Sequence, residues 1–478
     1  MPAADRLGPP PLIGPALVAG AGLIAAALML IADQTNPFVP LGLVAGFATL
    51  ALIVWRPLLG PLLGIALAAL EPFGLQFAGL ALSPAEAVFA AVGATWVARR
   101  LLNGQLPVLR TPLTLPIGLL LVAMVPGALL GADPATTIKI LVNWTLFFLM
   151  FQMIAAEGSA AYVRRLMFVL VIVGGVVGII AAVQGIAAGP QEITQGPIEG
   201  RAQGSFAQPN ILATFLALAL PATLVVGLTG PLHRRPVALA CFVTVCAGLS
   251  LSLSRGGLFA AMGALVILLL LPQFRRAALA LAAVFLVIGV VAGNPFGDVQ
   301  QAGSLVERLQ SVESSAQTNP RVALWKGTPA VIADHPFFGV GAGQFQTVAP
   351  RYRLIEPGTY VPFEHAHNIV LAIASEQGLI GLAALIWIVF VTVPILVKAV
   401  RIRRGLDQGM AIAIAGGLTA LMVQGLVDFT IRSNLIAATM FVLLACGVIL
   451  SRYDGEEPEP EPEPDELPPP AVPGAIAR

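Results

Sequence analysis

One polar segment of the chain gathers side chains that suit contacts with an anion. It runs from Arg201 to Asn210, reads RAQGSFAQPN, and directly precedes a long apolar run. Pro209 and Asn210 are typical of a helix start, where free backbone N–H groups attract anions. Gly204 and Ser205 allow a ligand to approach the backbone closely. With Arg201, the segment predicts a phosphate site; the alternative is a capped helix start beside a solvated arginine.

A second arginine occurs where two apolar runs meet with almost no loop between them. The segment reads Ser252-Leu-Ser-Arg255-Gly-Gly257. A guanidinium group suits bidentate contacts with phosphate, and the paired glycines indicate that another group packs close to the arginine. The alternative is that Arg255 reaches the lipid head groups at the end of a span.

The third segment extends from Asn319 to Gly343 and begins with Asn-Pro-Arg321. Residues 321–333 are expected to form an amphipathic helix on the membrane surface, with Trp325 at the interface. The glycines at the end of the segment follow no predicted strand. We therefore do not interpret them as a dinucleotide-binding fingerprint.

The fourth segment combines imidazole groups with a carboxylate inside an apolar run. Glu364-His365-Ala-His367 leads into the run, and Glu376 lies nine residues beyond His367, roughly 13 Å deeper at the rise of a helix. A carboxylate at such a depth is costly and usually functional; the alternative is a neutral or paired packing residue. His365, His367, Glu364 and Asp334 lack a specific zinc spacing, so we expect no metal.

The elements that must position these segments are membrane-spanning helices. The chain has 478 residues, of which 57% are hydrophobic and 11% charged, whereas soluble proteins carry about 25% charged residues. This composition excludes a soluble enzyme and a disordered chain, and the net charge of +1 gives no support to a nucleic-acid binder. We expect an all-α polytopic membrane protein with about 12 to 14 transmembrane helices. Candidate spans begin near Leu12, Phe38, Leu58, Pro84, Leu113, Ile138, Leu166, Ile211, Val237, Gly256, Ala277, His367, Met410 and Asn434. The third and fourth are short enough to be re-entrant or merged.

Basic residues cluster after the even-numbered candidate spans, which marks those loops as cytoplasmic. The clusters contain Arg99, Arg100, Arg110, Arg164, Arg165, Arg234, Arg235, Arg275, Arg276, Lys398, Arg401, Arg403 and Arg404. The four polar segments then fall on the outer face, where residues 294–366 form a large loop region with short amphipathic helices. Arg201, Arg255 and Arg432 stand close to span ends on that face, where a cation calls for an anionic partner.

Two domains are expected: a transmembrane helical domain over residues 1–451 and a tail over residues 452–478. The tail includes the run EEPEPEPEPDE. Alternating Glu and Pro cannot bury apolar area, so we expect a disordered acidic tail in the cytoplasm. The first apolar run is interpreted as an uncleaved helix rather than a signal peptide. Three cysteines within apolar runs predict neither a disulfide nor a metal site.

Taken in order, the four segments resemble the O-antigen ligase family, which also holds O-antigen polymerases and protein O-oligosaccharyltransferases. The shared pattern covers roughly residues 195–385: Arg-x-x-Gly-Ser…Pro-Asn, Ser-Arg-Gly-Gly, Arg-x-x-x-Trp with His-Pro-x-x-Gly-x-Gly, and His-x-His-Asn followed by Gly-x-x-Gly. The resemblance implies a GT-C-like fold and an inverting glycosyltransferase without metal or other cofactor. Such an enzyme moves a glycan from undecaprenyl diphosphate to an acceptor hydroxyl at the periplasmic face of the bacterial inner membrane.

The resemblance also implies roles for individual residues. Arg201 and Arg255 match arginines that hold the diphosphate, and His367 matches an essential histidine, either a base or a phosphate ligand. Further substrate contacts are expected from Arg321, His365 and Asn210. The implied partners are the lipid-linked glycan donor, a glycan, lipid A core or protein acceptor, and the bilayer, with no nucleic acid.

The chemistry of these residue types agrees with such a reaction. A departing diphosphate needs fixed cations, and a histidine suits removal of a proton from the acceptor hydroxyl. Three alternatives stay open: a polysaccharide polymerase of the same family, a transporter of bicarbonate or another small anion, and a membrane scaffold. The few polar residues within the spans argue against an ion pathway. They are Asn143, Gln152, Gln184, Glu376 and Gln424.

Overall fold

The computed structural model describes residues 38–67, 75–77, 80–82, 84–106, 109–187, 201–291, 320–355 and 360–452. The first candidate span, part of the outer loop region and the acidic tail beyond Arg452 lie outside these residues. The described chain is helical apart from one short antiparallel hairpin, in which β1 (Leu75–Phe77) pairs with β2 (Leu80–Leu82). The prediction of an all-α polytopic membrane protein is confirmed.

The long apolar runs form helices at every candidate position from Phe38 onward. The first half contains α2 (Phe38–Trp55), α3 (Leu59–Ala66), α4 (Pro84–Leu102), α5 (Thr114–Leu130), α6 (Pro134–Glu157) and α7 (Ala160–Ala187). The second half contains α8 (Pro209–Thr229), α9 (Arg235–Leu251), α10 (Arg255–Leu268), α11 (Pro272–Val291), α13 (Pro320–Asp334), α14 (Phe345–Val348), η4 (Ala349–Tyr352), α15 (Ile369–Ile402), α16 (Gly405–Gly425), η5 (Thr430–Arg432) and α17 (Asn434–Leu450).

Helix length separates the spans from the shorter pieces. Within the described residues, five helices are long and apolar enough to cross a membrane, namely α6, α7, α8, α15 and α16, and α5, α9, α10 and α17 are shorter apolar helices. Helix α3 has 8 residues and covers only ~12 Å, well short of a hydrocarbon core of ~30 Å. The third candidate is therefore too short to be a span.

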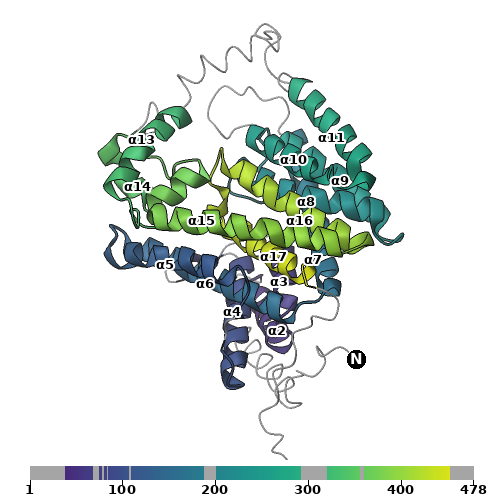
Figure 1. Cartoon of the computed structure of the whole chain (residues 1–478), viewed down its shortest axis with the longest axis horizontal. Helices are drawn as coiled ribbons and strands as arrows, with labels where there is room; N and C mark the ends of the chain where they lie inside the picture. The colour runs from purple at the N-terminus through teal and green to yellow at the C-terminus, as the bar shows by residue number, and fades with distance from the viewer. Residues whose placement is uncertain are drawn as a thin grey trace, which may run out of the picture.

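Helix α8 forms the centre of the bundle and packs against α7, α9, α10 and α16 (Figure 1). Nearly all of its side chains are buried, which is the environment that a helix apolar on every side requires. Small residues allow its neighbours to approach one another: a Cβ at Gly178 of α7 would lie 2.4 Å from the carbonyl oxygen of Thr244 in α9. Such close contacts are typical of helix packing in membranes.

The points at which the helices begin and finish define two ends of the bundle. At one end α8, α10, α15 and α17 begin and α9 and α16 finish. At the opposite end Arg164 binds Asp407 at 2.7 Å, and Arg403 donates to the carbonyl oxygen of Leu450. The basic clusters that predict the cytoplasmic side thus lie away from the end that carries the four polar segments.

A break in α15 shapes that polar end. Gly378 has φ +69°, and a Cβ there would lie 2.1 Å from the carbonyl oxygen of Phe337. The glycine-rich segment after α13 docks into the break, with Gly341 N donating to Glu376 O at 2.9 Å. In addition, Gly343 N donates to the Glu376 carboxylate at 2.8 Å. The glycines therefore serve backbone docking beside the start of α15 (Figure 1).

Candidate functional site

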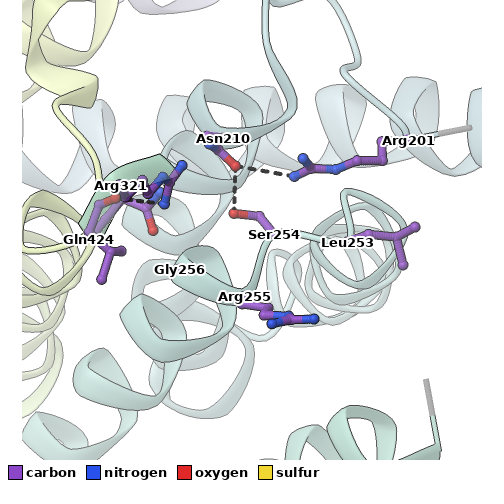
Figure 2. Close-up of a pocket in the computed structure, with 9 residues that line it drawn as sticks. Arg201, Asn210, Leu253, Ser254, Arg255, Gly256, Arg321 and Gln424 are labelled. Carbon is purple, nitrogen blue, oxygen red and sulfur yellow. Dashed lines mark hydrogen bonds between the residues drawn. The ribbon is translucent and has the colours of Figure 1, made fainter. Parts of the chain in front are cut away.

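Three arginines that are far apart in the sequence line one pocket at this end of the bundle. Arg201 comes from the loop before α8, Arg255 from the first residue of α10, and Arg321 from the start of α13 (Figure 2). The pocket has a volume of about 210 Å³. Its other lining residues are Asn210, Leu253, Ser254, Gly256, Gln424 and Val427. The first three polar segments thus meet at a single cationic pocket.

Asn210 links the parts of this arginine pocket to one another. Its Oδ1 accepts hydrogen bonds from Arg201 Nη2 at 3.1 Å and from Ser254 Oγ at 3.0 Å (Figure 2). Its Nδ2 donates to Asp428 Oδ2 at 2.6 Å. The expected helix start is present, because α8 begins at Pro209. Gly204 lies outside the pocket lining and exchanges hydrogen bonds with the amide of Gln184.

The arginines differ in how many protein contacts they already make. Arg201 Nε donates to Ser252 O at 3.0 Å, and Arg321 Nη1 donates to Val427 O at 2.8 Å. Burial, reinforced by Arg321, lowers the pKa of Arg201, but a guanidinium group stays charged at neutral pH. Arg255 is exposed and forms no hydrogen bond or ion pair with the part of the chain that the structure describes. Its cation is therefore open to a ligand.

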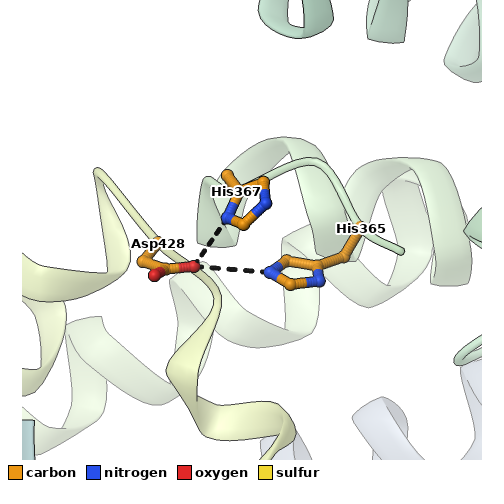
Figure 3. A group of neighbouring side chains, drawn as sticks. All are labelled: His365, His367 and Asp428. Carbon is orange, nitrogen blue, oxygen red and sulfur yellow. Dashed lines mark hydrogen bonds and ion pairs between the residues drawn. The ribbon is translucent and has the colours of Figure 1, made fainter. Parts of the chain in front are cut away.

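Asp428 connects the arginine pocket to the two histidines of the fourth segment. It lies between α16 and η5, and it is buried. While Oδ2 faces Asn210, Oδ1 lies 2.9 Å from His367 Nδ1 and 3.3 Å from His365 Nε2 (Figure 3). Burial acts to raise the pKa of Asp428, yet the hydrogen bonds to both histidines hold it well below its usual value. Asp428 is therefore a carboxylate that only accepts hydrogen bonds.

The hydrogen-bond partners of His365 define which of its ring nitrogens carries the proton. Arg432 Nη1 lies 2.8 Å from His365 Nδ1, and because arginine only donates, this nitrogen accepts and Nε2–H donates to Asp428. Burial, helped by His367 and Arg432 and opposed by the hydrogen bond to Asp428, lowers the pKa of His365 to about 4. His365 is therefore neutral at pH 7.

His367 is oriented differently, with one nitrogen held and the other open. Because Asp428 accepts, His367 Nδ1 donates to it. Nε2 lies on the side of the ring away from the carboxylate (Figure 3) and has no hydrogen-bond partner among the described residues. In the neutral ring this nitrogen carries a lone pair, as a general base requires.

The backbone on both sides of His367 is fixed. His367 itself has φ +48°, an uncommon value for a residue with a side chain. Trp325 Nε1 donates to Ala366 O at 3.0 Å, while Asn368 caps α15 by accepting from Val370 N and donates to Leu426 O at 2.8 Å. A helix is present over the predicted segment as α13, without a marked apolar face, and the indole N–H of Trp325 holds the chain beside His367.

The zinc set considered from the sequence does not assemble in the structure. Asp334 accepts from the hydroxyl of Tyr352 at 2.8 Å, and Glu364 pairs with Arg432. Instead, ligand atoms of His365, His367 and Asp428 lie within 4.8 Å of one another. Arginines contact two of these three residues, and fixed cations of this kind oppose binding of a dication. The group fits proton transfer better than metal binding.

Asp428 is the residue that sequence reasoning missed. The turn that contains it drew attention only for Arg432, and Asp428 belongs to none of the four recognised segments. The sequence gives one sign of its importance, since Asp428 is an isolated carboxylate at the end of an apolar run. Burial of a carboxylate there is costly, but the pattern does not identify the residues that it contacts.

A comparison with protein families matches residues 240–386 to the O-antigen ligase model. The match includes Arg255, Arg321, His365 and His367, whereas Arg201, Asn210 and Asp428 lie outside it and join the site through the fold. A comparison with curated proteins found no match. The match covers residues 240–386 of the 478-residue chain, and it supports an assignment to the O-antigen ligase family.

Proposed function

We propose that the protein is an inverting glycosyltransferase that moves a glycan from undecaprenyl diphosphate to an acceptor hydroxyl. One observation carries the proposal. A pocket lined by Arg201, Arg255 and Arg321 is tied, through Asn210 and Asp428, to a histidine with an open ring nitrogen.

The arginine pocket suits the diphosphate of the donor. When the bond from the sugar to the phosphate breaks, negative charge develops on the leaving oxygen, and fixed cations stabilise it. Arg201 is oriented in advance by Asn210 and Ser252, so little reorganisation is needed. Arg255 has no competing partner among the described residues, so it can form a bidentate contact with phosphate oxygens.

His367 completes the reaction as the base. The acceptor oxygen forms a bond to the anomeric carbon, the bond from that carbon to the diphosphate oxygen breaks, and the hydroxyl proton moves to His367 Nε2. Asp428 then stabilises the imidazolium through the hydrogen bond at 2.9 Å. Inversion follows because the acceptor attacks from the face opposite the leaving group.

The same arrangement supports a membrane location with the site on the outer side. The site lies at the bundle end opposite Arg164 and Arg403, and basic residues favour the cytoplasm. We therefore place the protein in the inner membrane of a bacterium, with the site facing the periplasm.

Deletion of the gene tests the proposal and separates its two forms. A ligase attaches finished chains, so its loss should leave long glycans unattached. A polymerase extends chains, so its loss should leave short glycans attached. Gel separation of surface glycolipids, combined with lipid-linked glycan analysis, measures both. Unchanged glycan length and attachment would contradict the proposal and favour a transporter or a scaffold.

Replacement of Asp428 by Asn should lower the rate of transfer about 100-fold or more, the contribution typical of a positioned base. The amide keeps the size of the side chain but can present an N–H group to His367, which disfavours the required tautomer. Initial rates with a labelled lipid-linked donor measure the effect. Asp407→Asn is the matched control, because Asp407 pairs with Arg164 at the other end of the bundle. Equal rates for Asp428→Asn and the control would remove Asp428 from the reaction.

Addition of EDTA to the purified protein should leave the transfer rate within about twofold of the untreated rate. Apart from His367 Nε2, the nitrogen and oxygen atoms of the histidine cluster that could bind a metal are already engaged with Arg432, Asn210 and one another. Transfer assays with and without the chelator, followed by Zn²⁺ or Mg²⁺ addition, measure this. Activity that is lost with EDTA and restored by one of these ions would establish a metal site at the histidines.

A further inference from the structure

A second cavity lies beside the histidine cluster and shares no lining residue with the arginine pocket. Its volume is about 280 Å³. The lining residues are Ile140, Trp144, Ala342, Gly343, Gln346, Glu364, His365, Glu376, Gln377, Phe429, Arg432 and Asn434. The proposed transfer of a glycan assigns no step to any residue of this wall, so the function of the cavity is open.

Asp428 stands between the two cavities. Its Oδ2 accepts from Asn210, which lines the arginine pocket, and its Oδ1 accepts from His365, which lines the second cavity. The ring of His365 has its centroid 4.1 Å from that of His367. A molecule in the second cavity that contacts His365 is therefore separated from the proposed base by one imidazole ring.

The chemical character of the second cavity differs from that of the arginine pocket. Trp144 and Phe429 offer aromatic surface, and the buried carboxylate of Glu376 and buried amide of Gln377 supply polar groups. Gln377 is only 2% exposed, and its Oε1 has no hydrogen-bond partner among the described residues. A buried unpaired acceptor costs free energy unless a ligand donates to it.

Glu364 and Arg432 pair with each other and are exposed, as is Gln346. These side chains mark the opening of the cavity, while His365, Glu376 and Gln377 are its buried polar groups. None of these buried groups is a cation at pH 7. The second cavity is therefore unsuited to the diphosphate that the arginine pocket is proposed to bind.

We propose that the second cavity binds a neutral sugar ring of the acceptor, the ring that carries the attacking hydroxyl; this inference rests on the proposed function. Sugar hydroxyls donate to carboxylate and amide oxygens, and the C–H face of the ring packs on aromatic side chains. The volume falls just below the ~300–1,000 Å³ of small-molecule pockets, so it holds one ring rather than a long chain.

This assignment agrees with the stereochemistry of the proposed reaction. Inversion requires the acceptor and the diphosphate to approach the anomeric carbon from opposite faces. The arginine pocket and the second cavity meet the Asp428 carboxylate through different oxygens. A donor held by the arginines and an acceptor ring in the second cavity would then occupy separate sites, which Asp428 connects.

A binding experiment tests the inference without any need for transfer. The full-length protein in nanodiscs is titrated with methyl glycosides of glucose, galactose and N-acetylglucosamine, and saturation-transfer NMR reports binding. We expect at least one glycoside to bind the wild type and to bind Gln377→Met and Glu376→Gln at least tenfold more weakly. Gln377→Met keeps the side-chain volume, and Glu376→Gln keeps an acceptor for Gly343 N.

Gln408→Met is the matched control, because Gln408 lies near the start of α16 and donates to Val400 O, away from both cavities. It should bind like the wild type. Absence of glycoside binding by the wild type, or equal binding by the cavity variants and the control, would overturn the inference.

A kinetic experiment distinguishes failure of the inference from failure of the proposed function. With an undecaprenyl-diphosphate-linked glycan as donor and the bound methyl glycoside as acceptor, Gln377→Met should raise the KM for the acceptor about tenfold and leave the KM for the donor within twofold. A higher KM for the donor alone would assign the cavity to the donor glycan and overturn the inference. Glycoside binding in the cavity without any consumption of donor would contradict the proposed function and leave the sugar site standing.

Discussion

Replacement of His367 by alanine is expected to reduce glycan transfer by about 100-fold to 10,000-fold, the range attributed to a positioned acid or base. The side chain supplies the only imidazole nitrogen of the cluster that has no partner among the described residues. Its loss removes the group that takes the acceptor proton. Initial rates with purified protein and a labelled lipid-linked donor measure the change.

A matched control exists for this variant. His233 is exposed, and it lies in the loop between α8 and α9, at the opposite end of the bundle. His233→Ala should transfer at the wild-type rate. Equal insertion and elution profiles of both variants would show that they fold. Wild-type turnover in His367→Ala would exclude this histidine from the chemistry.

Replacement of Arg255 by lysine should lower transfer about 100-fold to 1,000-fold, as for loss of one group that stabilises charge in the transition state. Lysine keeps the charge but cannot make a bidentate contact with phosphate oxygens. Arg255 forms no hydrogen bond or ion pair within the described chain, so the substitution breaks no contact there. The loss should therefore appear in activity rather than in stability.

Arg201→Lys should also transfer the glycan more slowly. It should in addition lower the stability of the protein, because Arg201 donates hydrogen bonds to Ser252 O and Asn210. Arg276→Lys serves as the control, because Arg276 is exposed near the start of α11. Parallel measurement of kcat, KM for the donor and thermal unfolding separates the effects. A rate of Arg255→Lys equal to that of Arg276→Lys would indicate contact with lipid head groups instead of the donor.

The helical part of the fold could be predicted because apolar runs leave few options in a bilayer. Every candidate span from Phe38 onward coincides with a helix, and α8 begins at Pro209 as its sequence indicates. Helix α3 departs from the prediction in its length, because hydrophobicity suggested a span but the helix has only 8 residues. The composition of a segment therefore predicts the position of a helix more reliably than its length.

The resemblance assigned Arg201 and Arg255 to the diphosphate and Arg321 to a further substrate contact, and the structure places all three around one pocket. The role of Asp428 could not be predicted from the sequence, for a physical reason. It is a single carboxylate after α16, and its role depends on contacts with Asn210 and His365, residues distant in the sequence.

Trp325 and the second cavity show the same limit. The sequence favoured the membrane interface for Trp325, since indole rings gather there, and it did not predict that the indole N–H donates to Ala366 O. The second cavity combines Trp144 of α6, Gln377 of α15 and Phe429 before η5. No local pattern links these residues, because only the packing of the helices and the break at Gly378 brings them together.

The central claim is that the arginine pocket and His367 carry out an inverting transfer from a lipid diphosphate. The most direct test uses wild-type protein in liposomes with an undecaprenyl-diphosphate-linked glycan of known anomeric configuration and a sugar acceptor. NMR of the product reads the configuration of the new linkage. We predict consumption of the donor and a linkage of inverted configuration. A product with the configuration of the donor, or a donor that remains intact, would contradict the account.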